Sequence, residues 1–267
     1  MKIAVFSSKP YDKAYFEKYD DQHNHMLSYF ETALDESTVN LTNGFDGICV
    51  FVNDKVNSEI IKALSKNGIK LIALRCAGYN NVDLDAAKEH EIKVLRVPAY
   101  SPEAVAEHAV ALIQTLNRKT HKAYNRIREG NFSLNNLLGF NLHEKTVGVI
   151  GTGIIGSTFC KIMLGFGCKV VAFDIKPSED LIGLGVALLE LNELFKTSDI
   201  ISLHCPLNPS TKHIIDAQSL SKMKDGVMII NTSRGGLINT SEVIDNLSSK
   251  KIGFLGIDVY EQEENYF

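Results

Sequence analysis

Short apolar runs alternate with longer amphipathic stretches over the first hundred residues of the chain. The runs KIAVFSS, GICVFVN, IKLIALR and KVLRVP have the length and composition of buried strands, whereas NSEIIKALSKNG and DLDAAKEH have helical spacing. This alternation predicts a parallel sheet with helices on its faces. Residues 57–67 read as a helix with Ser58 as its N-cap and Gly68 just past its end. The pattern of residues 20–44 is weaker, and we expect one short strand and one helix there.

A long helical pattern at residues 101–130 connects this first α/β domain to a second one. Ser101 is the expected N-cap, with Pro102 at the first helical position. One apolar stripe runs along the helix, formed by Val105, Ala109, Leu112, Ile113 and Leu116. After residue 146 strands and helices alternate again, with helices expected at 189–196, 216–223 and 240–250. The chain is therefore expected to form two domains, residues 1–100 and residues 101–267.

A glycine-rich turn stands at the start of the second set of strands. The apolar run TVGVI leads directly into G-x-G-x-x-G, made by Gly151, Gly153 and Gly156, and a helical stretch follows. In a dinucleotide-binding turn the first glycine permits the tight bend, the second lets a pyrophosphate approach the backbone, and the third lets the helix pack on the strand. The free N–H groups of the helix N-terminus favour such an anion. Strand, turn and helix together predict a dinucleotide site.

The acidic residue that closes the next strand favours one dinucleotide over the other. Asp174 follows Gly151 by 23 positions, where a carboxylate can accept hydrogen bonds from the adenosine ribose. Ile175 and Lys176 come next, so no arginine is placed to hold a 2′-phosphate. The sequence therefore predicts NAD rather than NADP as the cofactor.

Composition and charge narrow the partners to small molecules. The 267 residues are 45% hydrophobic and carry a net charge of −4, so no overall basic field attracts nucleic acid, and the basic stretch RKTHKAYNRIR is interpreted as a solvated helix face. The five cysteines lack C-x-x-C spacing, which favours a reducing cytoplasm. No run approaches the roughly 20 apolar residues of a membrane helix. We expect a cytoplasmic protein that binds neither nucleic acid nor membrane and has no metal site.

Several dispersed motifs, in order along the whole chain, resemble those of the D-isomer-specific 2-hydroxyacid dehydrogenase family, and in particular its fermentative D-lactate dehydrogenase members. They are FVND at 51–54, LRCAGYNNVDLDAA at 74–87, RVPAYSPEAVAEHA at 96–109, GTGIIG at 151–156, SLHCPL at 202–207, NTSRGGLI at 231–238 and GIDVYEQE at 256–263. The resemblance implies an α/β protein with two doubly wound parallel-sheet domains. These are a flavodoxin-like substrate domain and a Rossmann NAD-binding domain, hinged by two crossings with the active site in the cleft. It also implies NAD-dependent interconversion of pyruvate and D-lactate by a homo-oligomer, a dimer or a tetramer.

The resemblance assigns the catalytic roles to Arg234 and Glu263. Arg234 follows the strand VMIINTS, where a guanidinium can hold a substrate carboxylate bidentately and polarise its 2-oxo group. Glu263, in DVYEQE, matches the family glutamate that raises the pKa of a catalytic histidine. Asp258 resembles the residue that accepts a hydrogen bond from the nicotinamide amide.

Binding residues are assigned mainly by the same resemblance. The substrate carboxylate would meet the backbone N–H groups of Ala77 and Gly78, and the substrate pocket would be shaped by Tyr100, Phe51 and Val52. Besides the three glycines and Asp174, family contact positions for the cofactor correspond to Ile154, Ile155, Cys205, Pro206, Thr232 and, as a weaker candidate, Thr211.

One departure from the family concerns the catalytic histidine. That residue belongs to a G-H-x-A-like segment beyond DVYE, and this sequence stops at Phe267 before reaching it. His108 and His204 are interpreted as structural. We therefore expect a C-terminally incomplete chain with little dehydrogenase activity. The alternatives are a dehydrogenase for a bulkier 2-hydroxy acid and a non-catalytic NAD-sensing, corepressor-like protein.

Overall fold

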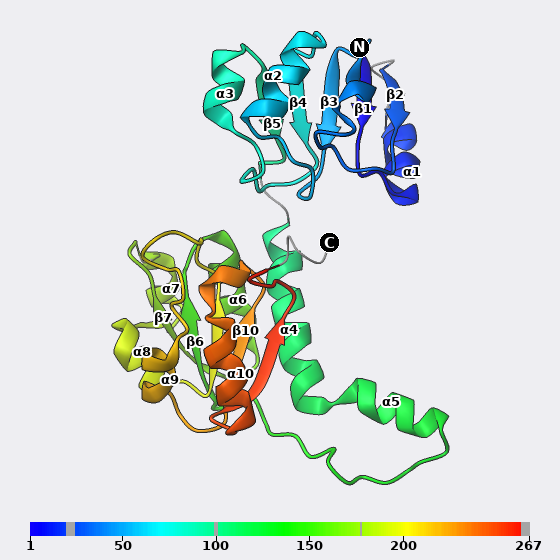
Figure 1. Cartoon of the computed structure of the whole chain (residues 1–267). Coiled ribbons are helices and arrows are strands. Elements are labelled where there is room, and N and C mark those ends of the chain that lie inside the picture. The colour runs from blue at the N-terminus through cyan, green and yellow to red at the C-terminus, as the bar shows by residue number, and fades with distance from the viewer. Residues whose placement is uncertain (20–24, 99–100, 177, 263–267) are drawn as a thin grey trace. The chain divides into compact units, whose positions relative to one another are not determined.

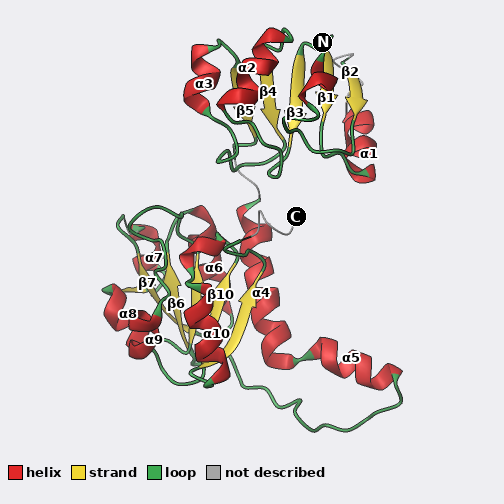
Figure 2. Ribbon diagram, viewed as in Figure 1, coloured by secondary structure: helices red, strands yellow, loops and turns green. Residues whose placement is uncertain are grey.

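The computed structural model describes residues 1–19, 25–98, 101–176 and 178–262, and it divides into two compact units, Met1–Tyr100 and Ser101–Tyr266 (Figure 1). Each unit is a parallel sheet with helices packed beside the strands (Figure 2). The expected α/β class with two parallel sheets is thereby confirmed. No helix in these described ranges has the length and apolar character needed to cross a membrane.

The first unit holds a five-stranded parallel sheet in the order β2-β1-β3-β4-β5. Its strands are β1 (Lys2–Val5), β2 (Met26–Tyr29), β3 (Gly47–Val50), β4 (Leu71–Leu74) and β5 (Lys93–Arg96). Its helices are α1 (Pro10–Tyr19), the 3₁₀ turn η2 (Val39–Thr42), α2 (Ser58–Lys66) and α3 (Leu84–Glu89). The apolar stripe of α2 is buried against the sheet. The short apolar runs thus become strands buried under amphipathic helices.

Two local expectations in this unit are wrong in detail. The N-cap of α2 is Asn57, not Ser58, because the Asn57 side chain accepts a hydrogen bond from the Ile60 N–H at 2.9 Å. Within residues 25–44, the described part of the region with the weaker pattern, the short strand exists as β2. The helix expected there is only the single 3₁₀ turn η2. That turn is held by Thr42, whose buried hydroxyl donates to the Val39 carbonyl at 2.7 Å.

The second unit holds a six-stranded parallel sheet in the order β11-β10-β9-β6-β7-β8. Its strands are β6 (Thr146–Ile150), β7 (Lys169–Phe173), β8 (Ala187–Leu188), β9 (Ile200–Leu203), β10 (Val227–Asn231) and β11 (Ile252–Ile257). After the connector come α6 (Ile154–Gly165), α7 (Glu179–Gly183), α8 (Leu191–Thr197), α9 (Ala217–Lys222), the 3₁₀ turn η3 (Gly235–Leu237) and α10 (Thr240–Ser248). The strand order reverses between the neighbours β6 and β9, which is the point where such sheets bind ligands.

The expected connector helix is two helices, α4 (Pro102–Arg118) and α5 (Thr120–Arg128). They meet at Lys119, which adopts a left-handed conformation with φ 52°. The break follows from a tertiary contact at the end of α4, where the buried Asn117 side chain accepts from the Phe140 N–H (2.7 Å) and donates to the Phe140 carbonyl (2.9 Å). The helix α4 packs on α6, β10 and β11, and its Ser101 N-cap accepts from the Ala104 N–H at 3.2 Å.

Candidate functional site

The bend between β6 and α6 depends on glycine at two positions. Gly151 has φ +96°, and a β-carbon there would lie 2.7 Å from the backbone nitrogen of Cys205. A β-carbon at Gly156 would overlap the Gly151 carbonyl. The first turn of α6 lies so close to the carboxyl ends of β6 and β9 that neither position tolerates a side chain.

Gly153 differs from these two glycines because nothing within 4 Å would meet a β-carbon there. Its surroundings are open, and it is the N-cap of α6 without any side-chain hydrogen bond to that helix. The neighbouring Ile154 is 72% exposed, while Ile155 packs on the core. An uncapped helix N-terminus beside open space offers its N–H groups and positive dipole end to an anion. This geometry fits a dinucleotide pyrophosphate.

Asp174 lies just past β7, beside the glycine turn. Burial by itself would raise the pKa of Asp174, but hydrogen bonds from the N–H groups of Lys176 and Thr152 and from the Thr152 hydroxyl outweigh it and lower that pKa. The carboxylate is therefore ionised at neutral pH. It borders a cavity of about 420 Å³ that is also lined by Ala172, Phe173, Leu188, Leu189, Glu190 and Glu193. The acidic lining disfavours a 2′-phosphate and leaves carboxylate oxygens for ribose hydroxyls.

The loop after β9 approaches the same turn. Cys205 is buried, and burial raises the pKa of its thiol to about 11, so it packs as a neutral side chain. Pro206 is exposed, and its carbonyl accepts from the Thr211 hydroxyl at 2.6 Å. Thr211 also accepts from the Asn208 N–H at 2.9 Å, so its hydroxyl already closes this loop. The loop geometry explains why Thr211 is the weaker cofactor candidate.

His204 has the properties of a structural residue. Burial lowers its pKa to about 4, its Nε2 is 2.9 Å from the Ser202 hydroxyl, and its ring centroid is 4.8 Å from that of Phe159. A histidine with this pKa is neutral near pH 7 and has no spare proton to give.

Arg234 stands at the carboxyl end of β10 on a loop tied down by neighbouring groups. The buried Asn231 side chain donates to the Arg234 carbonyl at 2.8 Å and accepts from the Ser233 N–H at 3.0 Å. A β-carbon at Gly235 would overlap the Tyr260 backbone, so the segment after β11 lies directly on this loop. The guanidinium itself is exposed and donates to the Ser233 carbonyl at 2.7 Å. The backbone is fixed, while the charged end can turn to a carboxylate.

Thr232, in the same loop, carries an unsatisfied polar atom. Its hydroxyl oxygen is buried and has no hydrogen-bond partner within the described part of the chain. Buried hydroxyls normally have partners, so an orphaned one beside a site indicates a ligand contact. Thr232 therefore stays a candidate for cofactor contact, with Gly153 and Asp174.

Asp258 follows β11 and pairs with a residue that the sequence did not connect to it. Its Oδ2 lies 3.3 Å from Nε2 of His108 on α4, and its N–H donates to the Asn231 carbonyl at 3.3 Å. His108 and Asp258 are 150 positions apart, so only the packing of α4 on β11 could reveal the pair. Asp258 is therefore in contact with both α4 and the end of β10.

The substrate candidates of the first unit lie at the carboxyl ends of β3 and β4. Phe51 is half-buried and Val52 is 44% exposed. The Ala77 carbonyl accepts from Arg96 Nη1 at 2.9 Å, and the Gly78 carbonyl accepts from the Cys76 thiol at 3.2 Å. Two further candidates, Tyr100 and Glu263, lie outside the described residues. Their roles stay predictions.

Comparison with known proteins identifies the family. Residues 110–266 match the family model described as D-isomer specific 2-hydroxyacid dehydrogenase, NAD binding domain. The chain is 51% identical over 267 residues to a D-lactate dehydrogenase of Escherichia coli (strain K12), covering all of this chain and 81% of that protein.

Solved structures agree with this match. The apo-structure of D-lactate dehydrogenase from Escherichia coli superimposes with a TM-score of 0.95 at 51% identity, over 99% of this chain and 84% of that one. A D-lactate dehydrogenase from Aquifex aeolicus, complexed with NAD and lactic acid, gives a TM-score of 0.85 at 37% identity, over 98% of this chain and 78% of that one. The second unit is accordingly an NAD-binding domain, and the chain belongs to the D-isomer specific 2-hydroxyacid dehydrogenase family.

Proposed function

We propose that this protein is an NAD-dependent dehydrogenase that interconverts pyruvate and D-lactate. The observation that carries the proposal is Arg234, an exposed guanidinium on a fixed loop at the carboxyl edge of the NAD-binding sheet. The D-lactate dehydrogenase of E. coli, half of whose aligned residues are identical, supports this choice of substrate.

Separate residues of the chain have separate roles in the proposed reaction. Bound NADH supplies the hydride that reduces C2 of the 2-oxo acid. Arg234 exchanges its bond to the Ser233 carbonyl for a bidentate contact with the substrate carboxylate, and it polarises the 2-oxo group. Glu263 would raise the pKa of the family's catalytic histidine, which is not among these 267 residues, and Asp258, paired with His108, would accept from the nicotinamide amide.

The first unit, residues 1–100, serves as the substrate domain in this proposal, with Tyr100, Phe51 and Val52 shaping the pocket. Arg96 fixes the Ala77 carbonyl. Because the C=O and N–H of a trans peptide point in opposite directions, the Gly78 N–H then faces away from Arg96. It is thereby available to a substrate carboxylate.

The test is pyruvate-dependent oxidation of NADH. Since the chain spans 81% of the E. coli relative, we would assay both this chain and a chimera that continues after Phe267 with the C-terminal segment of that relative. The chimera is expected to reduce pyruvate faster than 2-oxoisocaproate, and the chain alone to bind NADH but turn over slowly. Preference for the bulkier acid would support the alternative substrate class. Equal turnover by both proteins would point to His108 as the proton donor.

Arg234→Lys in the chimera tests the carboxylate contact. Lysine keeps the charge but loses the planar fork, so kcat/KM for pyruvate should fall by roughly 10–100-fold, while the Kd for NADH changes little. Arg118→Lys, at an exposed position at the end of α4, is the control and should have no effect. Normal turnover of the Arg234 variant would place the carboxylate contact elsewhere.

We also propose a homodimer, supported by an arm on the second unit whose loop exposes apolar side chains. The arm consists of α5 and the loop after it, which project from the sheet in Figure 1. Helix α5 buries none of its residues, and Phe132, Leu134 and Leu138 are 76%, 81% and 87% exposed. A second copy would cover such a surface. Sedimentation should show a dimer that the double change Leu134→Ser and Leu138→Ser converts to monomer; a wild-type monomer would contradict this.

We place the protein in the cytoplasm. Cys49, Cys160, Cys168 and Cys205 are buried thiols that form no disulfide within the described residues. Thiols kept out of disulfides are typical of a reducing compartment. Fractionation of cells should recover the protein with cytosolic markers, and recovery in a secreted fraction would refute the placement.

A further inference from the structure

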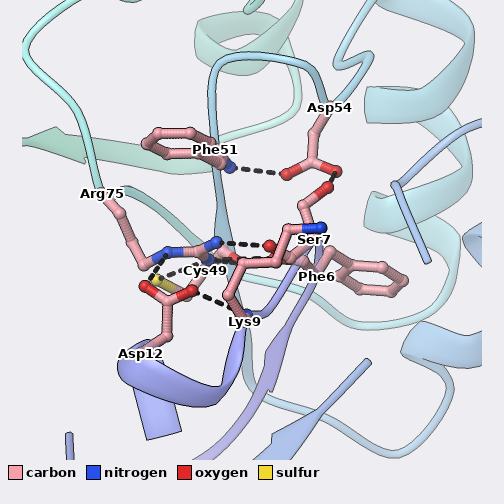
Figure 3. Close-up of polar contacts among 8 residues, drawn as sticks. All are labelled: Phe6, Ser7, Lys9, Asp12, Cys49, Phe51, Asp54 and Arg75. Carbon is pink, nitrogen blue, oxygen red and sulfur yellow. Dashed lines mark hydrogen bonds and ion pairs between the residues drawn. The ribbon is translucent and has the colours of Figure 1, made fainter. Parts of the chain in front are cut away.

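Arg75 joins the carboxyl ends of three strands in the first unit. It follows β4, and its side chain is only 9% exposed. Its guanidinium donates to the carbonyls of Phe6 (3.0 Å) and Ser7 (3.1 Å), which follow β1, and of Cys49 (3.3 Å), which precedes Val50, the last residue of β3 (Figure 3). An arginine with three carbonyl acceptors is held in one orientation.

The charge of Arg75 is balanced within the same cluster. Its Nε lies 3.4 Å from Oδ1 of Asp12, whose side chain is 14% exposed and whose Oδ2 accepts from the Lys9 N–H at 2.8 Å. The Cys49 sulfur lies 3.9 Å from Nη1, but burial raises the pKa of this thiol, so it stays neutral. Asp12 is therefore the counter-charge, and the ion pair further restricts the guanidinium.

The guanidinium also supports the ring of Phe51. Its central carbon lies 5.4 Å from the ring centroid, within the range of a cation–π contact. The backbone of Phe51 is fixed at both of its polar groups: its N–H donates to Asp54 at 2.5 Å, and its carbonyl accepts from Asn81 Nδ2 at 2.9 Å. Asp54 is 1% exposed and also accepts from the Ser7 hydroxyl, as Figure 3 shows. Ring and backbone are thus both positioned before any ligand binds.

We propose that Arg75 is a positioning residue that holds Phe51 rigid and thereby limits the size of the group on C2 of the 2-oxo acid. A ring resting on a fixed planar cation cannot tilt to admit a longer chain. Val52 follows Phe51 directly, so its place depends on the same anchored backbone. The inference rests on the substrate role proposed above for Phe51 and Val52, whereas the coupling of Arg75 to Phe51 rests on the structure alone.

Hydrogen exchange followed by mass spectrometry tests the coupling in the 267-residue chain, without any need for activity. Arg75→Lys keeps the charge and loses the planar fork, so the amides of residues 49–54 should exchange roughly 2–30-fold faster, the range expected for one cation–π contact. Helix α2 should be unchanged. Arg128→Lys is the matched control, because it removes another arginine–aromatic pair, 5.6 Å over Tyr124.

Phe51→Leu removes the other partner and gives a second, milder test. It should accelerate the same amides, and Arg75→Lys should then add less than it does alone. If Arg75→Lys does not fold, Phe51→Leu alone decides, because the proposal requires faster exchange of residues 49–54. The coupling would be overturned if Phe51→Leu left the exchange of residues 49–54 unchanged, or if the effects of the two substitutions were fully additive. Equal acceleration throughout the first unit would also overturn it.

Selectivity in the chimera tests the size limit. The ratio of kcat/KM for pyruvate to that for 2-oxobutyrate, which is longer by one methylene, should fall at least about threefold in Arg75→Lys and stay constant in the control Arg118→Lys. A constant ratio in Arg75→Lys would overturn the size limit. If the unsubstituted chimera reduced neither acid, the proposed function would fail together with the size limit, while the exchange result would still decide the coupling.

Discussion

Replacing Asp174 with asparagine should weaken the preference for NADH over NADPH. Asparagine preserves the shape and one acceptor oxygen, so the backbone around the turn keeps a partner for the Thr152 or Lys176 N–H. It removes the negative charge that the lowered pKa maintains at neutral pH. The change therefore removes the charge and one of the two backbone contacts, while it keeps the shape of the side chain.

The size of the effect follows from Coulomb's law. A ribose 2′-phosphate carries about −1.5 to −2 charges, and two unit charges about 4 Å apart repel by about 1 kcal/mol even in water. The repulsion is then about 2 kcal/mol, or about 30-fold in Kd. Asp174 is half-buried beside an acidic cavity, so this figure is a lower limit for the native protein.

The assay is titration of the chain with NADH and NADPH, followed by nicotinamide fluorescence. The native chain should bind NADH at least about 30-fold more tightly, and Asp174→Asn should reduce the ratio by about that factor, chiefly by improving NADPH binding. Asp245→Asn, at an exposed position on α10 that does not line the cavity, is the control and should leave the ratio unchanged. Equal affinities in the native chain, or an unchanged ratio in Asp174→Asn, would refute the reasoning.

The remaining predictions concern the glycine turn and pH. Gly153→Ala should keep its thermal stability but lose at least about tenfold in NADH affinity, because the open space serves the ligand, whereas Gly156→Ala should lose about 1–3 kcal/mol or more in stability by calorimetry. Burial lowers the pKa of His204 from 6.5 to about 4. Its contribution to the stability of the fold is therefore complete above pH 6.5 and declines as the pH falls to 4. The free energy of unfolding, measured in urea, should therefore fall by about 3 kcal/mol from pH 6.5 to pH 4. This fall should be absent in His204→Gln and present in His121→Gln, a control at an exposed position. The same pH dependence in both variants would contradict the prediction.

Local signals were sufficient for most of the fold. Apolar runs located the long strands of both sheets, and the glycine spacing located the bend that Gly151 makes with its positive φ. The two-residue strand β8 was missed because so short an edge strand has no periodicity of its own. The N-cap of α2 was misplaced by one residue because Asn57 and Ser58 are both good capping residues.

Features set by distant contacts could not be predicted. The break at Lys119 depends on Asn117 reaching Phe140, 23 residues further on. The pairing of His108 with Asp258 likewise requires the folded sheet. A local motif predicts which residue lies at the end of a strand, but the contacts of that residue depend on tertiary packing.

The site itself was predicted mainly through resemblance. The chemistry of Arg234 follows from its place at a strand end, but its fixed loop and exposed guanidinium are visible only in the structure. The arrangement of Arg75 around Phe51 was not anticipated, although both residues lie in stretches that carry the resemblance. Sequence patterns do not show which buried arginine supports which ring.

The stereochemistry of the product is a direct test of the proposed reduction of pyruvate to D-lactate. The chimera would be incubated with pyruvate and NADH, the NADH consumed would be measured by absorbance, and the lactate formed would be resolved by chiral chromatography. We expect one D-lactate for each NADH oxidised, with both formed more slowly, and in the same ratio, in Arg234→Lys. Formation of L-lactate, or tight NADH binding without pyruvate-dependent oxidation in the chimera, would contradict it.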